Sequence, residues 1–72
     1  MSDRIILEMA EARVLTGNYV AASKSKGKAL AATFLAKQIK KIEPLYGNGF
    51  DQRVRGYMRE IFESEFLEGT NQ

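Results

Sequence analysis

The sequence contains no histidine and no cysteine among its 72 residues. It therefore lacks the usual base that activates a serine or threonine nucleophile, the thiolate nucleophile, and the preferred nitrogen and sulfur ligands of transition metals. It also lacks the disulfide framework that holds many small secreted domains together. We expect a non-enzymatic, cytoplasmic protein that uses no cofactor and no metal.

Long apolar runs are absent too. No segment reaches the roughly 18 consecutive apolar residues that suggest a membrane span. The N-terminal stretch MSDRIILEMAEARVL carries acids within its apolar run and has no basic lead, so it is not expected to act as a secretory signal. Acid-rich loops of the kind that bind calcium are missing as well. We expect no membrane contact and no small-molecule substrate.

Only one proline interrupts the chain, and apolar residues recur at helical spacing along most of it. These features predict an all-α fold, a small bundle that forms a single domain over residues 1–72. We expect three main helices and a frayed C-terminal tail at about residues 69–72. The predicted helices lie near residues 3–16, 27–43 and 51–66.

The helix boundaries are predicted from capping and breaking residues. Gly17 is expected to stop the first helix, with Ser25 capping the second, Pro44 ending it and Asp51 capping the third. A short fourth helix near residues 18–24 would then follow Gly17. The alternative for this region is a small β-hairpin over residues 13–22, which its β-branched and aromatic content permits.

The second and third predicted helices each carry one apolar face that indicates a core. On the second helix this face holds Ala31, Phe34, Leu35, Ile39 and Ile42, and on the third it holds Val54, Tyr57, Met58, Ile61, Phe62 and Phe66.

The first predicted helix is apolar around well over half of its circumference. Its polar stripe is narrow and consists of Arg4, Glu8 and Glu11. A helix of this kind has to bury more than one side, either centrally in the domain or against a second copy. Because a chain of this size buries only about 60% of its unfolded surface, self-association would add needed stability. We therefore predict an oligomer interface at Ile5, Met9 and Ala12.

The charges are unevenly distributed along the chain. The net charge is only +2, but residues 24–41 carry six positive charges and no negative one, whereas residues 1–23 carry a net −1 and residues 42–72 a net −3. Lysines in the second helix fall opposite its apolar face, and the backbone N–H groups at its start favour anions. The alternative is a hydrated surface without a partner. The residues predicted to contact an anion or nucleic acid are Lys24, Lys26, Lys28, Lys37, Lys40 and Lys41.

Two functional hypotheses follow. The leading one is a small binding or regulatory protein that acts by protein–protein contact, as an inhibitor or adaptor, and forms a homo-oligomer. The alternative is a nucleic-acid-binding protein whose lysine-rich loop and helix face contact phosphates. A helix-turn-helix is not supported, because the link from Ile42 to Asp51 exceeds the short turn of that motif.

Overall fold

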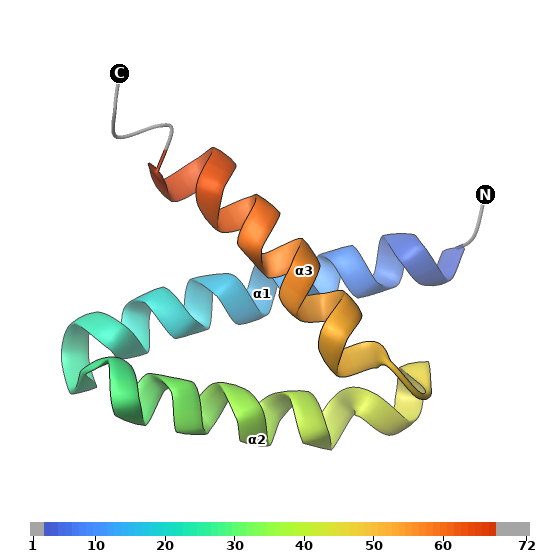
Figure 1. Cartoon of the computed structure of the whole chain (residues 1–72), viewed down its shortest axis with the longest axis horizontal. Helices are drawn as coiled ribbons and strands as arrows, with labels where there is room; N and C mark the ends of the chain where they lie inside the picture. Colours follow the sequence, from blue (N-terminus) through green and yellow to red (C-terminus); the bar gives the residue numbers. More distant parts are fainter. Residues whose placement is uncertain (1–2, 68–72) are drawn as a thin grey trace.

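Three α-helices form the part of the chain that the computed structural model describes, residues 3–67. α1 covers Asp3–Lys26, α2 covers Lys28–Tyr46 and α3 covers Phe50–Phe62, and a π-helical turn, η1, follows at Glu63–Leu67. α1 and α2 run antiparallel, and α3 crosses α1 at a steep angle (Figure 1). The described residues contain no strand, and the predicted all-α fold is confirmed. The predicted tail at residues 69–72 lies outside the described residues.

α1 is one continuous helix of 24 residues, although the sequence predicted two shorter pieces. Gly17 lies in its middle with no positive φ angle. A glycine inside a helix costs about 1 kcal/mol, and packing of Leu15 and Tyr19 against the core on either side of Gly17 outweighs that cost. The predicted stop at Gly17, the separate helix at 18–24 and the alternative hairpin at 13–22 are therefore wrong.

The turn between α1 and α2 consists of Gly27 alone. This residue has a φ of 92° and is the N-cap of α2, and its carbonyl accepts a hydrogen bond from the Ala31 N–H at 3.1 Å. Ser25 Oγ instead donates to the Ala22 carbonyl within α1. The predicted capping role of Ser25 is therefore wrong.

The turn between α2 and α3 depends on Gly47 and Gly49, which have φ angles of 90° and 84°. α2 continues through Pro44 because the Gly47 N–H donates to the Glu43 carbonyl at 2.9 Å and closes one more turn. α3 begins at Phe50 with Gly49 as its N-cap. The predicted helix end before Pro44 is wrong by three residues, and the predicted cap at Asp51 is wrong by two.

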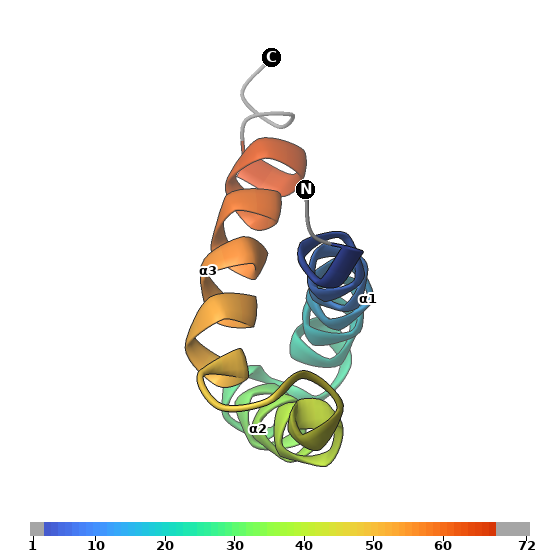
Figure 2. The same cartoon turned by 90° about the vertical axis from the view of Figure 1, so that its right-hand side faces the viewer.

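The core is small and lies where α3 crosses the α1–α2 pair. Phe50 is fully buried at the start of α3, and its ring stacks on Tyr46 with the ring centroids 4.8 Å apart. Figure 2 shows that α3 covers only one side of the α1–α2 pair. The buried apolar cluster consists of Ala12, Leu15, Ile39, Phe50, Val54, Met58 and Ile61.

The apolar faces predicted for α2 and α3 agree with this core at most positions. Ala31 and Ile39 are buried, and Leu35 and Ile42 pack partly against the core. Phe34 is the exception, because it lies at the edge of the apolar arc, where α3 does not cover it, and it is 42% exposed. In α3 the core residues are Val54, Met58 and Ile61, with Tyr57 and Phe62 partly buried. The Phe66 side chain lies outside the described ones.

Candidate interaction surfaces

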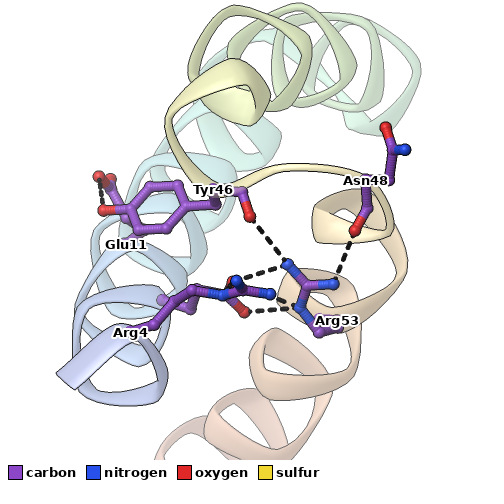
Figure 3. Close-up of polar contacts among 6 residues, drawn as sticks. Arg4, Glu11, Tyr46, Asn48 and Arg53 are labelled. Carbon is purple, nitrogen blue, oxygen red and sulfur yellow. Dashed lines mark hydrogen bonds and ion pairs between the residues drawn. The ribbon is translucent and has the colours of Figure 1, made fainter. Parts of the chain in front are cut away.

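A buried carboxylate fixes the orientation of α1. Glu8 is 1% exposed, and Arg53 of α3 donates to it from Nε at 2.9 Å and from Nη2 at 2.8 Å. The same guanidinium donates to the Asn48 and Tyr46 carbonyls at 2.8 and 3.3 Å, and so joins α1, α3 and the turn before α3 (Figure 3). Arg4 completes the ion pair on the α1 side, with Nε 3.6 Å from Glu8 Oε2.

The pKa values in this cluster follow from its contacts. Hydrogen bonds from Arg53 hold the pKa of the Glu8 carboxyl below its usual value, although burial acts in the opposite direction. Tyr46 donates its hydroxyl hydrogen to Glu11 Oε2 at 2.9 Å. Burial raises the pKa of the Tyr46 phenol, and the Glu11 carboxylate raises it further. The cluster is a structural connection, since each carboxylate in it already has a donor within the chain.

This orientation of α1 is the reverse of the predicted one, in which the stripe with Glu8 and Glu11 faces solvent. Glu8 points into the molecule instead of outward, and Glu11 is half-buried. Successive helical residues are 100° apart, so the inward direction of Glu8, Ala12 and Leu15 turns the opposite side of α1 outward. The residues on that side are largely apolar.

We call the exposed residues Ile5, Ile6, Leu7, Met9 and Val14 the α1 apolar surface. Their exposed fractions lie between 41% for Met9 and 60% for Val14. Monomeric proteins rarely expose large contiguous apolar patches, and such patches commonly mark interaction sites. The predicted interface residues Ile5 and Met9 are exposed, but each lies seven residues before a buried residue, Ala12 or Thr16, and therefore on the side of α1 away from Leu7 and Val14. Ala12 is fully buried in the core and therefore cannot contribute to an outer interface.

The six candidate lysines are all exposed, and the structure divides them into two groups. Lys24, Lys26 and Lys28 gather near the turn between α1 and α2, where Lys26 Nζ lies 5.4 Å from the centre of the Phe34 ring. The second group projects from α2 on the side opposite the buried Ala31 and Ile39. This group consists of Lys37, Lys40 and Lys41.

Lys24 and Lys28 also line an open groove of about 780 Å³ between the three helices. The C-terminal half of α1, the N-terminal half of α2 and the second half of α3 all contribute to it. We call this the basic groove, because all four of its charged lining residues are cations. Sequence reasoning missed Arg59, since it reaches the lysines only through the crossing of α3 over α1. The four cations are Lys24, Lys28, Arg55 and Arg59.

Among the described residues no three or more His, Cys, Asp or Glu side chains form a group that could hold a metal ion, and no helix within residues 3–67 is long and apolar enough to cross a bilayer. The described surface offers an apolar contact area, a basic groove and a separate group of exposed lysines on α2. No protein-family model, curated protein or solved structure matches this chain.

Proposed function

We propose that this chain is a small, non-enzymatic regulatory or adaptor protein that acts by protein–protein contact and assembles with itself through the α1 apolar surface. The exposure of five large apolar side chains within Ile5–Val14 carries this proposal. Burial of such side chains stabilises by about 1.5–3 kcal/mol each when it is complete. A second copy would cover those that lie on the Leu7 and Val14 side of α1, and a cytoplasmic setting fits a chain without cysteine.

The spacing on α1 supports self-association in an antiparallel arrangement. Leu7, Ala10, Val14 and Gly17 alternate at steps of three and four residues, the spacing of a helix–helix seam, and all four are exposed. In two antiparallel copies centred between Ala10 and Val14, Leu7 faces Gly17 and Ala10 faces Val14. Each layer then pairs a large side chain with a small one, which allows close packing.

The charges at the ends of α1 favour the same arrangement. Asp3 lies in the first turn, and Lys24 and Lys26 lie in the last turn. Antiparallel pairing brings Asp3 of one copy toward the basic end of the other and also opposes the two helix dipoles. A two-fold symmetric contact of this kind closes on itself and does not extend into a filament.

Sedimentation equilibrium at tens of micromolar tests the proposal. We expect the natural chain to sediment as a dimer and the Val14→Glu and Leu7→Glu variants to sediment as monomers with unchanged helical circular dichroism. Both side chains are more than half exposed in the single chain, so the substitutions leave its core intact.

Leu45→Glu is the matched control, because Leu45 is the most exposed large apolar residue among those whose burial is described (76%) and lies on α2. This variant should remain dimeric. A natural chain that stays monomeric, or a Leu45→Glu variant that dissociates as readily as Val14→Glu, would contradict self-association through α1.

A second candidate function is nucleic-acid binding. It is favoured by the six exposed lysines, none of which has an ion-pair partner among the described residues. Their division into two groups favours contacts to phosphates without reading of base sequence.

A further inference from the structure

The basic groove exists because α3 is held close to α2 at one end only. The turn Gly47–Gly49 and the stacked rings of Tyr46 and Phe50 hold the start of α3 against α2. From there α3 crosses α1, and its second half lies on the far side of α1 from α2 (Figure 1). The space between the two helices therefore opens toward the α1–α2 turn.

The groove combines an apolar floor with a basic rim. Tyr19, Leu35 and Met58 contribute apolar surface between the helices, and the cations stand around it. Arg55 is paired with Asp51 on its own helix. The other three cations, Lys24, Lys28 and Arg59, form no ion pair with any described residue. An occupant with one apolar side and flanking negative charges would satisfy both features.

We propose that the basic groove binds an acidic amphipathic helix of a partner protein. Charge complementarity selects an acidic occupant, because the groove lining has four cations and no carboxylate. Its open shape selects a helix over a small amphiphile, because small-ligand sites enclose 70–90% of their ligand, whereas a helix docked in a groove buries one face and leaves the other in water.

This groove is separate from the α1 apolar surface. Its α1 residues begin at Thr16, whereas the apolar surface ends at Val14, and the two sets have no residue in common. Lys24 also belongs to the basic end of α1 in the antiparallel pairing, but the two proposals rest on different apolar residues, so docking in the groove and self-association can fail separately.

Fluorescence anisotropy with a labelled synthetic peptide tests the proposal. The probe is a 15-residue helix-forming peptide with leucines at three- and four-residue spacing on one face and glutamates flanking them. The triple variant Lys24→Gln, Lys28→Gln, Arg59→Gln should bind it about tenfold more weakly than the natural chain, because three charge pairs are lost. The triple variant Lys37→Gln, Lys40→Gln, Lys41→Gln removes the same charge elsewhere and should change binding less than about twofold.

Two further measurements distinguish the groove from other binding surfaces. Val20→Asp, which places a negative charge in the groove lining outside the buried core cluster, should weaken peptide binding by a similar factor at unchanged helicity. The Val14→Glu chain should bind the peptide as the natural chain does, whatever its oligomeric state.

Four results would overturn the proposal. Equal weakening in both triple variants would indicate diffuse charge attraction, and loss of binding in the Val14→Glu chain would place the peptide on α1. The third is displacement of the peptide by a single-stranded oligonucleotide of equal charge that binds as tightly as the peptide does. This result would indicate that the groove is a phosphate-binding surface. Absence of peptide binding at low salt would equally contradict it.

Discussion

At the residue scale, the pairing of Glu8 with Arg53 determines which side of α1 faces the core. The sequence could not predict this pairing, because Glu8 and Arg53 are 45 positions apart and Glu8 sits in a stripe with Arg4 and Glu11 that is typical of a hydrated face. Burial of the carboxylate is tolerated because Arg53 supplies charge-assisted hydrogen bonds to both of its oxygens. The exposed apolar residues of α1 are the consequence.

Glu8→Gln should lower the free energy of unfolding by about 1–3 kcal/mol at neutral pH, since a neutral amide cannot replace the charged acceptor of Arg53. Urea denaturation followed by circular dichroism measures this change. Glu60→Gln is the control, because Glu60 is exposed and such substitutions usually change stability by less than about 0.5 kcal/mol. Equal effects of the two substitutions would show that the buried pair has no special role.

Acid should remove the same contribution from the natural chain. The pKa of Glu8 is lowered in the folded state, so its stabilisation is complete above the unfolded-state pKa of about 4.3. It is lost as the pH falls through the lower folded-state pKa. The stability difference between the natural chain and Glu8→Gln should therefore shrink as the pH falls below about 4. A difference that stays constant to pH 2 would contradict a lowered pKa.

At the element scale, the sequence predicted the buried faces of α2 and α3 well, but it predicted the face of α1 and the helix ends poorly. Ile39, Val54 and Met58 lie on the predicted apolar arcs because a repeat near 3.6 residues averages over many positions. Gly17 and Pro44 each disfavour a helix by about 1–3 kcal/mol, and for this reason the sequence predicted helix ends at both. Tertiary packing overcomes this cost at Gly17, and one bridging hydrogen bond overcomes it at Pro44. The prediction of a helix end depends on single residues, whereas the prediction of a helix face depends on the pattern along the whole helix.

Gly17→Ala and Gly49→Ala should have opposite effects on stability. A Cβ at Gly17 would meet no atom within 4 Å, so alanine should stabilise the helix by about 0.5–1 kcal/mol. Gly49 has a φ of 84°, and a Cβ there would lie 2.9 Å from Arg53 Nη1. Alanine at this position should therefore destabilise by about 1–2 kcal/mol.

Thermal melting of both variants measures the sign of each change in stability. Using the Val14→Glu chain as the common background keeps the measurement independent of self-association through α1. If α1 instead ended at Gly17, that glycine would adopt a left-handed conformation and Gly17→Ala would destabilise. A loss of stability at this position would therefore argue for two helices in place of one.

At the scale of the whole molecule, the thinness of the fold explains why so much apolar surface stays exposed. The molecule measures 33 × 28 × 14 Å along its principal axes, and α3 covers one side of the α1–α2 pair (Figure 2). The narrow core leaves Leu30 and Leu45 of α2 exposed along with the α1 apolar surface. The sequence predicted a wide apolar arc on the first helix, but only the crossing of α3 decides which part of that arc is buried.

The distribution of lysines over the whole molecule gives the second candidate function its own test. Each phosphate neutralised on duplex DNA contributes about −0.9 to the slope of log K against log salt concentration. If DNA binds across α2, replacing Lys37, Lys40 and Lys41 by glutamine should lower both affinity and slope. Helicity should stay nearly constant, because these side chains are exposed.

A mobility-shift assay with labelled DNA and RNA across a salt series measures this dependence. The groove variant Lys24→Gln, Lys28→Gln, Arg59→Gln serves as the comparison, because it removes the same charge from a different part of the surface. A steep slope that only the α2 substitutions reduce would favour nucleic-acid binding through α2. If neither DNA nor RNA shifts at low salt, the α2 lysines form a hydrated surface or a protein contact. Binding of an acidic protein partner would also be sensitive to salt, but it would produce no mobility shift of DNA or RNA.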